Sequence, residues 1–491
     1  MIQNKTNITI VTGLLVGVSV IAVIALYLTM GLEKQWLYMT AALVVSYMLF
    51  MVVNDKELAL IQTLIFLLQF EIGFLYMDMT AHDTLWAFDV IAILLYFLWI
   101  VDSGGISWNK MIKSNLFYPA LGMLIWTSFS IPFSISKMSA MLGLLYQTKA
   151  VIIFILIINR VNKRKEIFAI LNTFMVSLVF QSIIAILQRV YNRPLGLRFL
   201  GEMQYNMWWT LARVQGTFGY PNQFAAYLIL LIPFAICLAI FIRKAAYRVF
   251  YIIVILLSLT TLILTLSRSS WLGMIVAIIL IVLLTVSQKK IGSKSFLVFG
   301  VVLVLAVTVI NGFYELIQLR FNHSAVQDEN RILMIKIALQ LIARNPVIGC
   351  GLFNFEYHSY SIFQFWHPVH NIFLRLAAET GIPGVSFFIW FIIRVYRNAF
   401  MGFRLKDKFF SMAGLGIMGG YTAFLIACQF GPEYQQYRQQ TTFWILGALS
   451  VVIHKVHMTE VLEERKKTER RLANQKRPPR NPRQPFPQGR A

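Results

Sequence analysis

The chain has 491 residues, of which 58% are hydrophobic and only 13% are charged, and its mean hydropathy is +0.68. Soluble globular proteins carry about 25% charged residues, so this composition excludes a soluble domain and indicates a protein of the lipid bilayer. The formal net charge is +23, but the basic residues are spread over loops and a tail, which argues against a nucleic-acid partner. Three cysteines, at positions 237, 350 and 428, indicate neither a disulfide framework nor a paired metal motif.

Apolar runs recur along the chain at spanning length, which is about 20 residues for a helix. The first, Ile8 to Met30, lacks a cleavage signature and is interpreted as a retained anchor. We predict an all-α, polytopic integral membrane protein with about 12–14 transmembrane helices. The runs begin near residues 8, 36, 58, 84, 116, 138, 167, 222, 247, 269, 295, 383, 410 and 438.

Basic residues gather in alternate loops, for example Arg160 to Lys165 and Arg394 to Lys408. The positive-inside rule assigns such loops to the cytoplasm. Strict alternation then predicts that both termini are cytoplasmic.

The chain divides into three parts on this basis. Residues 1–190 form N-terminal transmembrane helices, and residues 191–454 form a second transmembrane region. Residues 455–491 hold eleven Lys or Arg against four Glu and end in a proline-rich run, so we expect a basic, disordered cytoplasmic tail. Contact with anionic lipid would explain this tail, and a dedicated partner is the alternative.

Two outward loops, at 191–221 and 315–371, are too long to be turns, and loops of this length are usually functional or disordered. Both are rich in aromatic residues, which favours order. The alternative is an interfacial aromatic belt. We predict that the second loop contains interfacial helices and the working site.

The second loop begins with a predicted helix, DENRILMIKIALQLIARNP. Lys336, Gln340 and Arg344 recur every four residues and form one polar stripe, whereas Arg331 points about 140° away from Lys336. A guanidinium off the solvated face needs an anion. Local pairing with Asp328 or Glu329 is the alternative.

Next, NPVIGCGLFNF predicts a turn with close backbone approach. His358, His367 and His370 follow, but no carboxylate or cysteine joins them at a recurrent spacing, so we predict no metal site.

HNIFLRLAAETGIPG then predicts a short helix from near His370 to Gly381. Arg375 and Glu379 are four residues apart and can pair. Glu379 lies on the opposite face from His370. A helix N-terminus lowers the pKa of a histidine, which favours the neutral, basic imidazole.

Two further arginines stand beside membrane helices. Arg213 precedes a glycine-rich turn, with Asn222 opening the next helix, and Arg268 lies at a tight outward turn. With Arg331 they form a plausible clamp for a diphosphate lipid, because guanidinium groups match phosphate oxygens. Headgroup anchoring explains them equally well.

Three charged residues, Glu71, Asp89 and Lys149, fall inside apolar runs, where an unpaired charge is costly. They pair with one another or line a pathway.

The ordered motifs resemble the O-antigen ligase and O-antigen polymerase family of bacterial surface-glycan enzymes. They are R-x-x-G-T-F-G-x-P-N at Arg213, S-R-S at Arg268, N-R at Arg331 with N-P-x-x-G-x-G, and H-N-x-x-L-x-x-x-A-E-T-G-x-P-G at His370. The resemblance covers residues 205–385, whereas the N-terminal helices contribute only hydropathy.

The resemblance implies transfer of a saccharide from a polyprenyl (undecaprenyl) diphosphate carrier to a glycan or glycolipid hydroxyl, without a cofactor or metal, at the outer face of the bacterial cytoplasmic membrane. Arg213 and Arg331 would bind the diphosphate, with Arg268 nearby, and His370 would activate the acceptor. Asn222, Asn371 and Glu379 would support them. Ligase and polymerase both remain open.

The rival interpretation is a transporter or flippase of a lipid-linked saccharide or small anion, which the charged residues inside the apolar runs would support. We detect no inverted repeat, and the polar residues gather outside the spans. A scaffold for glycan assembly, using the basic tail, is a further alternative.

Overall fold

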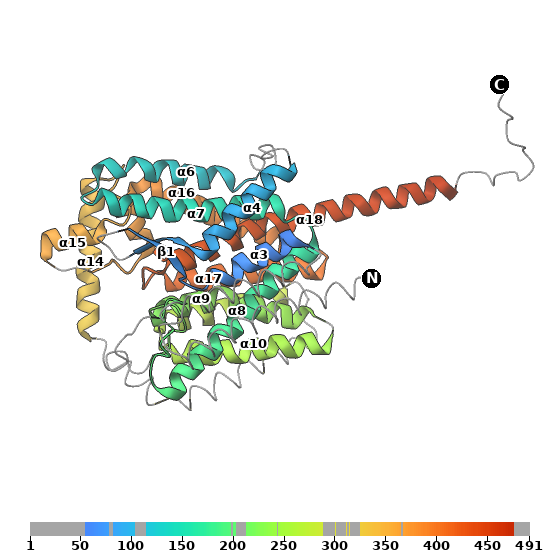
Figure 1. Ribbon diagram of the computed structural model, residues 1–491, viewed down its shortest axis with the longest axis horizontal. Coiled ribbons are helices and arrows are strands. Elements are labelled where there is room, and N and C mark those ends of the chain that lie inside the picture. The colour runs from blue at the N-terminus through green and yellow to red at the C-terminus, as the bar shows by residue number, and fades with distance from the viewer. Residues whose placement is uncertain are drawn as a thin grey trace, which may run out of the picture.

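The computed structural model describes residues 55–77, 82–103, 114–197, 200–202, 213–242, 244–287, 300, 311, 314, 325–364 and 367–475. These residues form a helical bundle with one short hairpin (Figure 1). The elements are α3 (Lys56–Leu67), β1 (Gly73–Met77), β2 (His82–Trp86), α4 (Ala87–Ser103), α6 (Phe117–Phe129), η2 (Ile131–Phe133), α7 (Lys137–Arg160), α8 (Arg164–Tyr191), α9 (Pro221–Phe241), α10 (Ala245–Leu264), α11 (Arg268–Ser287), α14 (Ala325–Arg344), α15 (Phe355–Phe363), α16 (Ile372–Phe403), α17 (Lys408–Ala427), η5 (Glu433–Gln435) and α18 (Tyr437–Gln475).

Eight described helices, α7 to α11 and α16 to α18, are long and apolar enough to cross a membrane. The chain is therefore an all-α, multi-pass membrane protein. The spans predicted near residues 58, 84 and 116 correspond to α3, α4 and α6, which are shorter, with 12, 17 and 13 residues. The spans predicted near residues 8, 36 and 295 lie outside the described residues.

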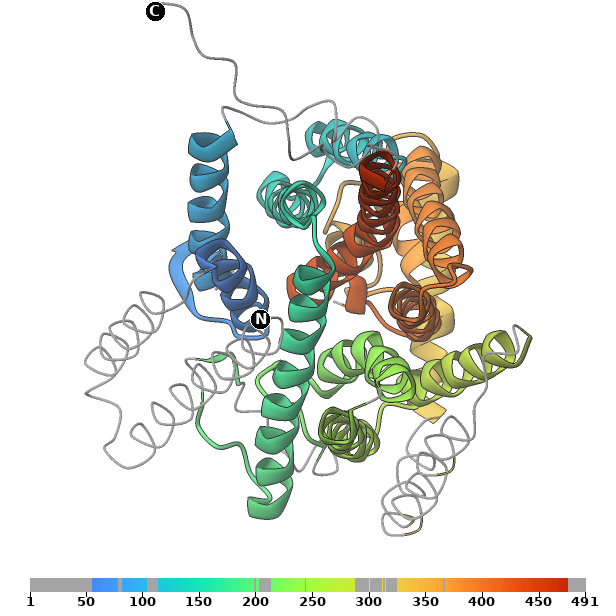
Figure 2. The same ribbon diagram turned by 90° about the vertical axis from the view of Figure 1, so that its right-hand side faces the viewer.

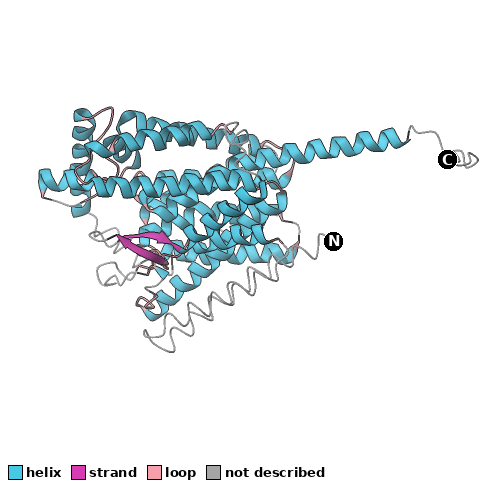
Figure 3. Ribbon diagram, turned by 45° about the horizontal axis from the view of Figure 1, so that its top comes forward, coloured by secondary structure: helices cyan, strands magenta, loops and turns pink. Residues whose placement is uncertain are grey.

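A small antiparallel hairpin, β1–β2, interrupts the helices near the predicted span at residue 84 (Figure 3). Apolar periodicity did not predict it, because short apolar runs fit strands and buried helices equally. Helix α4 follows β2 directly, so this span begins at Ala87.

Helix α9 lies at the centre of the bundle (Figure 2). In its most apolar stretch of 18 residues, 89% of the residues are buried. Its neighbour α17 reads SMAGLGIMGGYTAF, and three of its glycines face α9: Gly416 lies against Phe234, Gly419 against Pro233 and Gly420 against the carbonyl of Leu230. Small residues let two membrane helices approach closely. The helices then associate through dispersion contacts, because the hydrophobic effect does not drive association between helices within the lipid.

We call the end of the bundle from which α18 projects the inner end, and the opposite end, which carries α14 and α15, the outer end (Figure 1). Ion pairs join three helices at the inner end: Arg164, the first residue of α8, contacts Asp407 before α17 at 2.8 Å and Glu460 within α18 at 2.6 Å. Lys455 donates to the carbonyl of Ile158 at the end of α7, at 2.7 Å.

The prediction of a disordered segment over 455–491 is wrong in its first part, because α18 remains helical to Gln475. The residues after 455 are mostly Glu, Lys, Arg and Leu, which are good helix formers, and the prolines begin only at Pro478. Residues 476–491 lie outside the described part.

At the outer end, α14 and α15 lie across the ends of the long helices (Figure 1). Helix α14 buries Met334, Ile337, Ala338 and Leu341 in a small separate core with Cys350, Phe355, Val369 and Ala378. The predicted polar stripe of Lys336, Gln340 and Arg344 is exposed. The predicted helix and its amphipathic pattern are therefore confirmed.

The predicted glycine turn, between α14 and α15, docks on α16 by backbone contacts. Gly349 and Gly351 have φ angles of +77° and +100°, and a Cβ on Gly349 would come within 2.5 Å of the carbonyl of Glu379. The amides of Cys350 and Gly351 donate to the carbonyls of Ala378 and Glu379 at 2.9 and 2.8 Å. These carbonyls are free to accept because Gly381 interrupts α16 with a φ of +73°, as its predicted helix-ending role requires.

Candidate functional site

Arg213 is held at the outer end by two helices of the bundle. Its Nε donates to the carbonyl of Thr265, at the end of α10, at 2.6 Å, and a terminal nitrogen donates to Oδ1 of Asn222 in the first turn of α9. Asn222, which the sequence placed at the start of this helix, is thus in contact with Arg213. The guanidinium is thus fixed in direction.

The backbone after Arg213 is locked by two glutamines seven residues apart on α8. Oε1 of Gln188 accepts from the amides of Gln215 and Gly216 at 3.1 and 3.0 Å. Oε1 of Gln181 accepts from the amide of Thr217 at 3.0 Å. A spacing of seven places both side chains on one helix face, so α8 holds the backbone of this segment along its length.

The charged residues predicted inside the apolar runs form two separate ion pairs. Lys149 contacts Asp89 at 2.5 Å, as expected for pairing. Glu71 pairs instead with Arg438 at 2.8 Å, and Arg438 also donates to the carbonyls of Gln69 and Thr217 at 3.0 and 2.8 Å. Arg438 therefore ties α18 to the Arg213 segment.

His370 lies two residues before α16 and is half-buried. Burial lowers the pKa of His370 to about 3, assisted by the charges of His367, Arg331 and Arg375. The direction agrees with the expectation, but the first cause is burial rather than the helix terminus. Its Nδ1 is buried with no hydrogen-bond partner among the described residues.

Asn371 positions this histidine by capping α16. Its Oδ1 accepts from the amides of Phe373 and Leu374, both at 3.0 Å, and its Nδ2 donates to Oε1 of Gln429 at 2.9 Å. Capping satisfies backbone amides that have no partner within the helix. The cap also joins His370 to the turn after α17.

A buried ionic network lies below His370. Arg375 pairs with Glu379 at 3.1 Å, as predicted, and with Glu356 of α15 at 2.6 Å. Glu379 also accepts from Nε2 of Gln435 at 2.5 Å. The network links α15, α16 and η5, and it gives Glu379 a role in the scaffold rather than beside the imidazole.

Glu433 is the residue that sequence analysis missed. It lies in η5, between α17 and α18, and is only 3% exposed. Burial raises the pKa of Glu433 to about 7, against the opposing charges of Arg331 and Arg213. Its Oε2 is buried without a hydrogen-bond partner in the described structure. The unusual run GPEYQQYRQQ between two apolar spans was the available signal.

Electrostatic influence therefore connects residues from four distant segments. Arg331 acts on both His370 and Glu433, and Arg213 acts on Glu433. Arg331 is partly buried on α14, away from the exposed stripe. The alternative of local pairing stays open, since the side chains of Asp328 and Glu329 lie outside the described part.

Arg268 is the first residue of α11, three residues after Thr265. The amide of Val214 donates to the carbonyl of Leu264 at 3.3 Å, so the backbone that carries Arg213 adjoins the turn before Arg268. The backbone at Arg268 therefore lies close to the backbone of the segment that carries Arg213.

His367 and His370 have ring centroids 4.9 Å apart, whereas His358 belongs to α15. Over the described ranges, no group of three or more His, Cys, Asp or Glu side chains is arranged to hold a metal ion. What the site offers is two arginines, a neutral imidazole and a buried carboxyl. Such a set can bind a multivalent anion and exchange a proton next to it.

The fold and the site together define a polytopic membrane protein with two arginines, an imidazole and a buried carboxyl gathered at one end of its helices. Residues 253–389 match the family model described as O-antigen ligase, so this part of the chain is similar to that family. The match includes Arg268, Arg331, His370, Asn371 and Glu379, and it excludes Arg213, Asn222 and Glu433. The search of curated proteins gave no match.

Proposed function

We propose that this protein transfers a saccharide from a polyprenyl diphosphate carrier to an acceptor hydroxyl at the outer face of the bacterial cytoplasmic membrane. The observation that carries the proposal is the convergence of Arg213, Arg331, His370 and Glu433 at the outer end. The predicted charge distribution supports an outward site with cytoplasmic termini.

In the proposed reaction, the acceptor oxygen attacks the anomeric carbon and the bond from that carbon to the diphosphate oxygen breaks. The leaving diphosphate takes the electron pair, and Arg213 and Arg331 neutralise its charge. The acceptor proton passes to Nδ1 of His370, which is buried without a partner in the described residues. A single displacement inverts the anomeric configuration.

A pKa of about 3 makes the imidazole of His370 a weak base in the ligand-free site. The donor changes this, because its diphosphate would offset the positive charges that contribute to the low pKa. Donor binding would therefore raise the pKa of His370 and prepare it to accept a proton. This order of events prevents a strong base from forming before the substrate is in place.

Glu433 would balance the two arginines while the donor is absent. Its pKa of about 7 means that the carboxyl is protonated below this pH and charged above it. A charged carboxylate repels diphosphate, so donor binding favours the protonated form. We therefore expect donor affinity to fall as the pH rises above about 7.

The test is transfer by purified full-length protein, with a synthetic polyprenyl diphosphate oligosaccharide as donor and candidate acceptors. Product from the wild type, lost in His370→Ala and Arg331→Ala, supports the proposal. Lys336→Ala is the matched control, because Lys336 is exposed on the same helix as Arg331. Undiminished turnover in His370→Ala would remove this residue from the mechanism.

Glu433 requires its own measurement. Glu433→Gln keeps the shape and removes the titration, so its donor KM should vary less between pH 6 and pH 8 than that of the wild type. An unchanged pH profile would exclude Glu433 from donor binding.

The acceptor separates ligase from polymerase. Transfer to a core glycolipid would identify a ligase, and transfer to another carrier-linked saccharide would identify a polymerase. Movement of the donor across liposome membranes without a covalent product would favour a transporter instead. The ion pairs made by Glu71, Asp89 and Lys149 do not support a transporter.

A further inference from the structure

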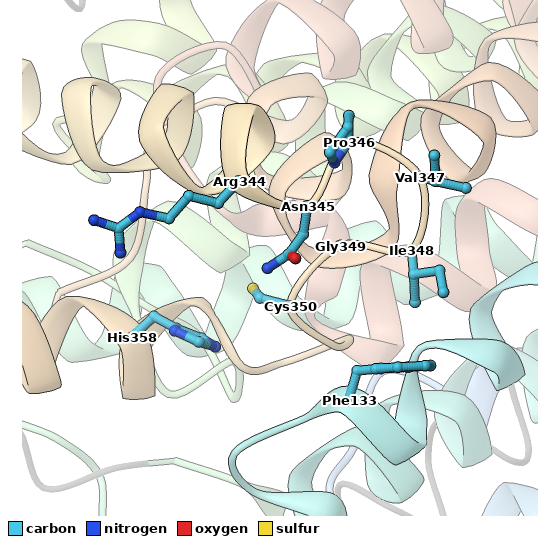
Figure 4. Close-up of a pocket in the computed structure, with 9 residues that line it drawn as sticks. All are labelled: Phe133, Arg344, Asn345, Pro346, Val347, Ile348, Gly349, Cys350 and His358. Carbon is cyan, nitrogen blue, oxygen red and sulfur yellow. The ribbon is translucent and has the colours of Figure 1, made fainter.

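A pocket of about 340 Å³ opens at the outer end, between η2, the end of α14 and α15 (Figure 4). Arg344 and His358 lie on one side of it and Phe133 on the other, with the turn from Asn345 to Cys350 between them (Figure 4). Its volume is within the range of small-ligand sites.

This pocket is separate from the site of His370. Arg331 and Arg344 are 13 residues apart on α14, which corresponds to about 20 Å at 1.5 Å per residue. An occupant of the pocket therefore does not compete with a diphosphate held by Arg331.

The polar side of the pocket attracts an anion. Arg344 is exposed at the last residue of α14. Nε2 of His358 is buried with no hydrogen-bond partner among the described residues, and burial lowers the pKa of His358, assisted by the charge of Arg344. An anion between the two groups would accept hydrogen bonds from the guanidinium and from the imidazole, and its negative charge would oppose the lowering of the pKa of His358.

The dipole of α14 opposes this attraction, since a helix C-terminus carries partial negative charge. Arg344 and His358 must then supply the binding energy, so each becomes a sensitive test.

The other side of the pocket is apolar and exposed. Phe133 is 63% and Val347 55% exposed, and Phe129, at the end of α6, is 57% exposed. The turn is fastened to this surface, because Trp126 of α6 donates to the carbonyl of Val347 at 3.3 Å. Exposed apolar residues at the ends of membrane helices face lipid.

We propose that this pocket binds the phosphate headgroup of a membrane lipid at the outer end, with Arg344 and His358 on the phosphate and the lipid chain along Phe133 and Phe129. A soluble anion would use only the polar side. A phospholipid uses both sides at once, with its phosphate on the polar side and its chains on the apolar side.

The experiment measures binding of phosphatidic acid to the full-length protein in detergent, by native mass spectrometry. Diacylglycerol is the matched ligand control, because it has the same chains without the phosphate. Arg344→Gln should weaken phosphatidic acid binding about tenfold, as the loss of a charge-assisted hydrogen bond implies. Phe133→Ala should weaken it as well.

Lys336→Gln is the matched protein control, since Lys336 is exposed on the same stripe eight residues earlier. It should bind as the wild type does. Equal binding of diacylglycerol and phosphatidic acid, or unchanged binding in Arg344→Gln, would overturn the proposal. Displacement of the lipid by millimolar inorganic phosphate would overturn its lipid part and leave an anion pocket.

Melting temperatures separate lost binding from lost folding. This test requires no transfer reaction, so its failure would leave the proposed function intact, and the converse also holds.

Discussion

Two outer parts of the chain are held in different ways: the segment 213–220, which carries Arg213, and the segment 345–371, which follows the helix α14 that carries Arg331. The first is tied by side chains to four bundle helices: Gln181 and Gln188 of α8, Thr265 after α10, Asn222 of α9 and Arg438 of α18. The second, with α14, builds a separate small core and docks on α16 through backbone hydrogen bonds and the Arg375 network.

This difference divides the proposed diphosphate clamp into two halves. Arg213 belongs to the bundle and cannot move without it. Arg331 belongs to α14, which together with residues 345–371 forms an added layer on the bundle. This layer is able to shift as a unit. We expect the layer, rather than the bundle, to adjust when substrates bind, since local stability follows local packing.

The largest expected effect comes from removing either half of the clamp. Arg213→Ala and Arg331→Ala should each lower the transfer rate about 100-fold or more, the usual cost of losing one group that stabilises developing charge. Initial rates at saturating donor measure this. Arg404→Ala, an exposed arginine at the inner end, is the control. Rates within twofold of wild type in both variants would rule out the clamp.

Arg375→Ala should release the added layer. Removing one partner leaves Glu356 and Glu379 without their buried cation, which costs about 3–5 kcal/mol. We expect a lower melting temperature and faster amide hydrogen exchange in 345–371 than in 213–220. Equal acceleration in both segments would mean that the layer is not a separate unit.

Gln188→Ala should loosen the segment 213–220 rather than the added layer. It leaves the amides of Gln215 and Gly216 without their acceptor, at a cost of about 1–3 kcal/mol. Hydrogen exchange should then accelerate in 213–220 and stay unchanged in 345–371. Leu187→Ala is the control, because Leu187 is exposed on the same helix. Greater exchange in the control than in Gln188→Ala would contradict the role given to the glutamine.

Asn371→Ala should have the smallest effect, about 1 kcal/mol, the usual cost of losing a helix cap. Thermal melting measures the loss. Asn371→Asp is a good cap too and should restore most of the stability. A matching loss in the aspartate variant would point to the hydrogen bond with Gln429 instead.

Several site features could be predicted because they depend on local order along the chain. The polar stripe of α14 follows from a spacing of four, and the pairing of Arg375 with Glu379 follows from the same periodicity. The turn at Gly349 and the break at Gly381 follow from residues that tolerate positive φ.

Other features could not be predicted, because their partners are distant. Glu71 pairs with Arg438 across 367 positions, and no local pattern selects that partner over Lys149. Glu433 gains its raised pKa from burial and from arginines that other helices bring to it. The extension of α18 to Gln475 is not evident from composition, because charged residues are typical both of solvated helices and of disordered tails.

The sequence by itself determined the membrane class, most of the helices and the family motifs, because hydropathy and short-range periodicity are properties of neighbouring residues. Only the tertiary structure decided which charges meet. It brought Glu433 under the charges of Arg213 and Arg331, and His370 under the charge of Arg331, since burial and electrostatic proximity arise from packing among helices that lie far apart in the chain.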